Sequence, residues 1–368
     1  MTVEFDNYDY SPLVRSRRAE LVGYKNLTAE IKRQILPVFI LGKWPKSDDI
    51  RDSMKKCAEV VGDNPFVIDT TRLAEHRGDG GKGFTVHDLV EPARAFKAWR
   101  DFLSEFEEST NLIPTVQLHG EANPRDIMQQ TLQLEEDYGQ IALRVNAAKG
   151  KQLDITMFAL GAMKDPGNAI VYIDLGFITE GNMPAQERAA VTSINSLRSV
   201  ASMVNIVLCG SSFPSSVVAH GERQGAIPIL ERRIYRKLGG RDVALYGDYS
   251  SIHPEIGPVA YGYVPRVDYP TPEFWHYFRK QDKPKSDGYI ASAKRIMDLG
   301  EWDPLLEAWG VEQIARVAEG DATKMGSPAN WIAVRVNLHL TQQTLNPPGY
   351  VDDAFEEEGI EDDENWAL

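Results

Sequence analysis

Charged, phenolic and hydroxyl side chains stand in or directly after several short apolar runs of this sequence. The run "VALYGDYS" contains Asp248 and Tyr249, and "PFVIDT" contains Asp69. Asp174 lies within "AIVYIDLGF", and Arg144 lies within "QIALRVNA". Such groups can bind an anion, hold a metal ion or move a proton if the fold brings them together.

One interpretation of the acidic set is a metal-assisted hydrolase. Carboxylate oxygens and imidazole nitrogens are ligands that divalent metals accept, and a bound metal activates water for attack on a phosphate ester. The cofactor would then be a divalent metal. The sequence contains neither H-x-H nor H-E-x-x-H, so no motif supports this site. The candidate catalytic residues are Asp69, His119, Asp174 and Asp248.

A second interpretation is a site for an anion. Arg144 and Asp174 form either a buried ion pair that fixes adjacent strands, or part of a clamp in which Arg144 grips a phosphate or carboxylate. The basic cluster Arg15, Arg17 and Arg18 either reaches that ligand or forms a solvated edge. The candidate ligand-binding residues are Lys43, Arg144, Ser211, Ser212, Tyr249 and Arg266.

Eight apolar runs predict strands that are buried on both faces, and helical patterns fill most of the gaps between them. Alternating strands and helices favour a parallel sheet, and eight such units favour an α/β fold closed into a (β/α)8 TIM-like barrel. The C-terminal ends of the strands then gather the polar residues on one rim. An open doubly wound sheet is the rival fold, but the only Gly-rich loop, "RGDGGKGF", lacks a phosphate-binding spacing. The predicted strands are 36–41, 65–70, 112–120, 140–147, 169–177, 203–214, 243–250 and 264–270.

The chain extends beyond the barrel at both ends. We predict an N-terminal extension over 1–35, with a helix from about Thr28, and the barrel over 36–280. "EFWHYFRK" is a candidate extra strand, and three helical patterns follow it. They predict a C-terminal helical appendix over 281–346 that packs on the barrel. The acidic residues 347–368 are typical of a disordered tail.

Composition narrows the class of protein. The chain has 368 residues, of which 42% are hydrophobic and 26% charged, as in an ordinary globular protein. A net charge of −14 argues against general affinity for nucleic acid, although it leaves room for a local basic pocket. The two cysteines, the lack of an apolar leader and the lack of a membrane-length apolar run predict a cytoplasmic protein that does not enter a membrane.

Four stretches carry a resemblance to a known family. They are "YSPLVRSRRAEL" with "ILPVFIL" near the start, "GSSFP", "ERRIYRKL" with "LYGDYSSIHP", and "GSPANWIAVRVNLHL". With these stretches the chain resembles the beta protein family of phage and bacteria. The resemblance implies a TIM-like barrel and a role in phage–host conflict, as defence or counter-defence. It implies no catalytic residues.

Three hypotheses for function follow. The first is a conflict protein that binds a phosphate-bearing ligand or nucleic-acid end at the rim, or a protein partner through the appendix. The second is the metal-assisted phosphodiesterase or similar hydrolase described above. The third is a non-catalytic scaffold whose polar ring is structural.

Overall fold

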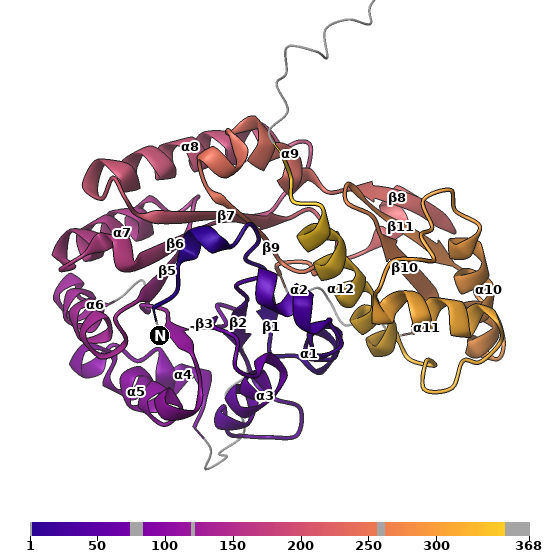
Figure 1. Cartoon of the computed structure of the whole chain (residues 1–368), viewed down its shortest axis with the longest axis horizontal. Helices are drawn as coiled ribbons and strands as arrows, with labels where there is room; N and C mark the ends of the chain where they lie inside the picture. Colours follow the sequence, from indigo (N-terminus) through magenta and orange to yellow (C-terminus); the bar gives the residue numbers. More distant parts are fainter. Residues whose placement is uncertain (1, 74–83, 119–121, 256–261, 350–368) are drawn as a thin grey trace, which may run out of the picture.

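Parallel strands with helices packed outside them make up most of the molecule (Figure 1). The computed structural model describes residues 2–73, 84–118, 122–255 and 262–349. The prediction of an α/β protein with parallel sheets is confirmed. Within the described ranges, no helix has the length and apolar character that a bilayer crossing requires.

The parallel strands form two four-stranded sheets. In the first sheet the order is β1 (Leu13–Arg15), β2 (Val38–Leu41), β3 (Phe66–Thr70) and β4 (Leu112–Pro114). In the second the order is β5 (Ile141–Asn146), β6 (Ala169–Phe177), β7 (Asn205–Ser211) and β9 (Leu245–Asp248). Seven of the eight predicted runs therefore contain a parallel strand. The run 112–120 is a strand only over its first residues.

The edges of the two sheets meet at both sides through isolated parallel bridges. Thr115 pairs with Ala142 on one side, and Tyr10 pairs with Tyr246 on the other. The backbone N–H of Val116 donates to Ala142 O at 2.8 Å. Closure into one (β/α)8 barrel stays a prediction, and these two contacts favour it.

Helices lie between successive strands along the chain and cover the outer face of the sheets in Figure 1. They are α3 (Arg51–Val61), α4 (Val86–Leu89), α5 (Ala93–Ser104), α6 (Pro124–Tyr138), α7 (Gly150–Ala162), α8 (Met183–Val200) and α9 (Leu230–Lys237). Short 3-10 turns lie at Phe5–Asn7, Glu107–Ser109, Pro166–Asn168, Val217–His220 and Gly240–Asp242. The predicted helix after Thr28 is α2 (Ala29–Gln34), whose first turn is capped by the Thr28 hydroxyl, and α1 (Arg18–Lys25) precedes it.

The prediction that 264–270 is a parallel strand beside the others was wrong. The run does form a strand, β10 (Arg266–Pro270), but β10 pairs antiparallel with β11 (Phe274–Arg279). Its apolar residues alternate, which is typical of a sheet with one buried face. The eighth parallel strand is instead β1, whose three residues are too short to stand out as an apolar run.

A second layer stands beside the parallel strands at the right of Figure 1. It consists of the antiparallel sheet β10–β11–β8, with β8 at Gln224–Pro228, and of α10 (Lys285–Met297) and α11 (Trp309–Ala318). The sequence assigned the residues of β8 to a helix, but the helical segment starts only at Leu230. The three predicted C-terminal helices are confirmed as α10, α11 and α12 (Pro328–Leu345).

Helix α12 joins this second layer to the parallel strands. Val336 and Leu340 belong to the core beneath the outer helices, whereas Val334 and Leu338 belong to the core of the second layer. The helix also approaches α1 closely, because a Cβ at Gly23 would lie 2.7 Å from the carbonyl oxygen of Ala333. The C-terminal helix is therefore part of both cores.

Candidate functional site

Strand alternation decides which polar residues face the inside of the fold, meaning the face of the strands that is turned away from the outer helices. Asp69 lies opposite Ile40, and Arg144 lies opposite Tyr172. Ile40 and Tyr172 both belong to the inner apolar cluster, which draws residues from both sheets. Asp69 and Arg144 therefore share the inner face with that cluster.

Arg144 and Asp174 form an ion pair, which is one of the two alternatives that the sequence left open, and a second carboxylate joins it. The Nε of Arg144 lies 2.7 Å from an oxygen of Asp69, and its Nη1 lies 3.6 Å from Asp174. All three side chains are buried. Burial lowers the pKa of Arg144, but Asp69, followed by Tyr249 and Asp174, raises this pKa by more, so the guanidinium stays charged.

Asp174 is held on its other sides as well. The hydroxyl of Tyr249 donates to Asp174 at 2.6 Å, and the backbone N–H of Gly176 donates at 2.9 Å. Burial, followed by the charge of Asp174, raises the pKa of Tyr249 well above its usual value. Tyr249 is therefore a neutral hydrogen-bond donor in this site.

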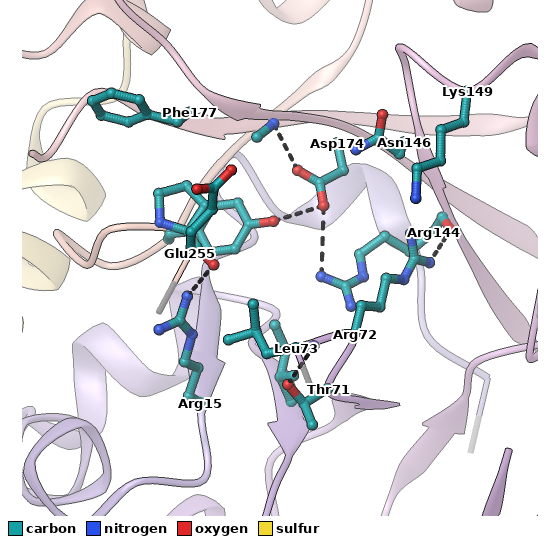
Figure 2. A pocket seen from close by; sticks show the side chains of 14 residues that line it. Arg15, Thr71, Arg72, Leu73, Arg144, Asn146, Lys149, Asp174, Phe177 and Glu255 are labelled. Carbon is teal, nitrogen blue, oxygen red and sulfur yellow. Dashed lines mark hydrogen bonds and ion pairs between the residues drawn. The ribbon is translucent and has the colours of Figure 1, made fainter. Parts of the chain in front are cut away.

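A pocket of about 160 Å³ opens above this network, at the C-terminal ends of the strands (Figure 2). Four basic side chains line it, and they come from β1, the loop after β3, β5 and the start of α7. Its charged lining residues are Arg15, Arg72, Arg144, Lys149, Asp174 and Glu255.

Three of the four cations have no carboxylate partner among the described residues. The guanidinium of Arg15 is buried and donates to the carbonyl oxygens of His253 at 2.8 Å and Pro254 at 2.5 Å. Arg72 donates to the carbonyl oxygen of Arg144. Lys149 lines the pocket and forms no ion pair within the described ranges. The pocket thus carries excess positive charge in a chain of net charge −14.

Asp248 does not join this pocket, because it points to the opposite face of β9 from Tyr249. Tyr10 donates to its carboxylate at 2.7 Å, and the Nε2 of His339 lies 2.8 Å away. Trp275 donates to the Nδ1 of His339 at 3.2 Å, so Nε2 carries the proton that Asp248 accepts. Burial raises the pKa of Asp248, but the contact with His339 and the hydrogen bond from Tyr10 outweigh it and lower this pKa.

The two serines at the end of β7 are also engaged in the fold. Ser211 accepts a hydrogen bond from the backbone of Phe213. The Ser212 hydroxyl donates to Glu231 at 2.6 Å, and its backbone N–H donates to the same oxygen at 2.9 Å. Burial raises the pKa of Glu231 to about 8, against a smaller lowering by Ser212. Neither serine lines the pocket described above.

The remaining predicted residues lie elsewhere. Lys43 is exposed and pairs with Asp48 at 2.9 Å. Arg266 pairs with Asp268 at 2.9 Å in the antiparallel sheet, where Arg335 of α12 also binds Asp268. His119 lies outside the described residues. From the predicted set, the structure therefore brings together Asp69, Arg144, Asp174 and Tyr249.

Within the part of the chain that the structure describes, no group of three or more His, Cys, Asp and Glu side chains could hold a metal ion. Asp69 and Asp174 are the nearest approach to one, but the guanidinium of Arg144 already lies beside both carboxylates. The catalytic metal set stays a prediction that now depends on His119.

The sequence did not identify Lys149 as a site residue, and it left undecided whether Arg15 reaches the ligand or lies at a solvated edge. Lys149 directly precedes α7 and follows Asn146, the last residue of β5, by three positions. A basic residue between a strand end and a helix start is the signal that could have indicated it, since ligands gather there in parallel α/β folds. Arg15 belongs to the pocket rather than to a solvated edge.

Comparison with known proteins gives two matches. The sequence pattern of the family described as Beta protein matches residues 10–344. Protein beta of Enterobacteria phage P4 is 40% identical over 347 residues, which make up 93% of this chain and 95% of the phage protein. The family match extends over the parallel strands, the pocket and the C-terminal helices up to residue 344.

We expect Arg144→Met to destabilise the fold strongly. The change leaves Asp69 and Asp174 buried without a counter-charge, and breaking a buried pair in this way costs about 3–5 kcal/mol. Urea unfolding measures the loss, with Arg188→Met on the exposed face of α8 as the matched control. Adding Asp69→Asn should recover part of the loss, and equal stability of Arg144→Met and the control would contradict the assignment.

We also expect Glu231 to make stability fall as pH rises. Its raised pKa means that the native state binds a proton that the unfolded state releases between pH 4.5 and about 8. The stability is fully present below that range and is lost as pH rises through the native pKa. Glu231→Gln should therefore gain about 1–4 kcal/mol relative to wild type between pH 5 and pH 9.

Unfolding free energies at several pH values give this difference directly. Glu180→Gln changes an exposed glutamate and serves as the control, which should follow wild type at every pH. A constant difference between Glu231→Gln and wild type across the range would show that Glu231 is ionised at neutral pH.

Proposed function

This chain belongs to the beta protein family, as the sequence resemblance predicted, and on that premise we propose that its pocket binds a phosphate-bearing ligand. The observation that carries the proposal is the convergence of Arg15, Arg72 and Lys149, three cations without an ion-pair partner among the described residues. Arg15 is buried, and a buried cation is costly unless an anion compensates it, whereas Arg72 and Lys149 are exposed and open to a ligand. The ligand supplies that anion.

The chemistry of the donors favours a phosphate group. Arginine presents its N–H groups in a planar fork that matches two phosphate oxygens, and lysine acts as a point charge beside them. Helix α7 begins at Gly150, directly after Lys149, so the positive end of its dipole lies at the same place. Arg144 fixes the floor of the pocket, because Asp69 and Asp174 already neutralise it.

Figure 2 shows Lys149 and Arg15 approaching the pocket from opposite sides, with Asp174 between them. Asp174 and Tyr249 are oriented by their mutual hydrogen bond, and the Tyr249 oxygen keeps its second lone pair. A protonated phosphate oxygen can donate to such an acceptor. The pocket therefore offers donors to the charged oxygens and an acceptor to a protonated one.

We expect Arg72→Ala and Lys149→Ala each to weaken the binding of inorganic phosphate about tenfold or more. A hydrogen bond to a charged group is worth about 1.5–3 kcal/mol, and about 1.4 kcal/mol is tenfold in affinity. Isothermal titration calorimetry in a phosphate-free, low-salt buffer measures the dissociation constants. Neither side chain forms an ion pair with Asp69 or Asp174, whose counter-charge is Arg144, so both variants should fold.

Arg33→Ala and Lys294→Ala remove exposed cations that do not line the pocket, and they are the matched controls. Both should bind phosphate as wild type does. Wild-type protein that binds no phosphate, or controls that weaken binding as much as the pocket variants, would exclude the pocket as an anion site.

We further propose that the liganded protein acts in phage–host conflict, as defence or counter-defence. The similarity to a protein encoded by phage P4 over 93% of the chain supports this setting. Bacteria that produce the wild-type chain should then differ in plaque number from bacteria with an empty vector, over a panel of phages. The double variant Arg72→Ala, Lys149→Ala should abolish the difference, whereas Arg33→Ala, Lys294→Ala should retain it. Equal plaque numbers for wild type and empty vector throughout would reject this role.

A further inference from the structure

A second and larger cavity adjoins the phosphate pocket. Its volume is about 750 Å³, compared with about 160 Å³ for the pocket. Thr71, Arg72, Leu73 and Lys149 line both, so the two basic residues stand at the boundary between them. Ligand sites in proteins usually measure about 300–1,000 Å³, so the pocket accommodates a phosphate group and the cavity accommodates an organic molecule.

Aliphatic side chains form one continuous part of the wall of the larger cavity, beside polar lining residues that include Asp69, His87 and Lys151. Val86 and Val90 come from α4 and its end, Val116 and Leu118 follow β4, and Ile155 comes from α7. Four of these side chains belong to the core cluster beneath the helices, and Val90 packs against that cluster. Such a surface gains free energy when an apolar group displaces water from it.

The two glutamine side chains in the cavity already accept hydrogen bonds from other groups of the protein. The Oε1 of Gln117 accepts a hydrogen bond from the Thr70 hydroxyl at 2.8 Å. The Oε1 of Gln152 accepts from the backbone N–H of Asn146 at 3.1 Å. Each of these two oxygens already accepts a hydrogen bond, so a ligand with many hydroxyl groups would exchange its hydrogen bonds to water for few new ones there.

We propose that the ligand is a phosphate monoester of an apolar, ring-sized organic group. Its phosphate lies in the pocket against Arg72 and Lys149, and its organic group lies among the aliphatic residues of the larger cavity. This inference rests on the proposed phosphate site and adds the class of molecule that carries the phosphate. The shared boundary residues place the ester oxygen between the two spaces.

Three probes test this selectivity by titration calorimetry: inorganic phosphate, ribose 5-phosphate and phenyl phosphate. We expect phenyl phosphate to bind at least tenfold more tightly than inorganic phosphate, because it buries an apolar ring in addition to the charge. Ribose 5-phosphate should gain little, because its hydroxyl groups lose water. Phenyl phosphate that binds no more tightly than inorganic phosphate would overturn the inference while leaving the phosphate site intact.

The substitution Val90→Trp fills the cavity without touching the phosphate pocket. It should remove the extra affinity for phenyl phosphate and leave the affinity for inorganic phosphate unchanged. Val191→Trp makes the same change at a residue of α8 that is 43% exposed, and it should bind both probes as wild type does. If Val90→Trp binds phenyl phosphate as tightly as wild type, the organic group does not lie in this cavity.

A second variant, Val90→Thr, tests the same cavity in case Val90→Trp does not fold. Val90→Thr keeps the shape of the side chain and makes the wall polar, so it should weaken phenyl phosphate at least threefold and inorganic phosphate not at all. If the phosphate site itself is wrong, the titrations give a different result: none of the three probes binds, and Arg72→Ala changes no dissociation constant. That result would reject both the proposed function and this inference.

Discussion

One guanidinium joins the two parallel sheets from inside. Arg144 belongs to β5 of the second sheet, and Asp69 belongs to β3 of the first, so their contact of 2.7 Å crosses from one sheet to the other. Among the described residues, the sheet edges meet at the isolated bridges Thr115–Ala142 and Tyr10–Tyr246, and the buried ion pair adds to these contacts. Because Asp174 shares the same cation, the positions of three strand ends depend on one side chain. Arg144 and Asp174 also line the pocket, so the same contacts fix the positions of its lining side chains.

A second buried charge, Asp248, fixes how the C-terminal helix sits against the strands. It faces the outer side of β9 and is held by Tyr10, Tyr246 and His339. Gly247, one residue earlier, permits a close approach, since a Cβ there would lie 2.9 Å from the backbone oxygen of Ser11. Neighbouring residues of one strand thus serve two purposes: Asp248 anchors a helix, and Tyr249 orients the carboxylate of the candidate site.

The sequence allowed the parallel α/β class and the Arg144–Asp174 pair to be predicted, since charged residues inside apolar strands must find partners. It placed Asp248 beside Asp174 because both stand in apolar runs, whereas strand alternation sends Asp248 to the other face. The three residues of β1 are too few to stand out as an apolar run in the sequence. Their positions depend on contacts with distant segments, which local periodicity does not encode.

The arrangement of α12 has a consequence for how the chain acquires its structure. Asn337 of this helix donates to the carbonyl oxygen of Gly23, and the two residues are 314 positions apart in the chain. His339 likewise reaches the carboxylate that Tyr10 binds. Contacts of such high sequence separation form late and slow folding. During synthesis, the N-terminal segment can pair with β2 early, but nearly the whole chain must leave the ribosome before the segment meets its partners in α12.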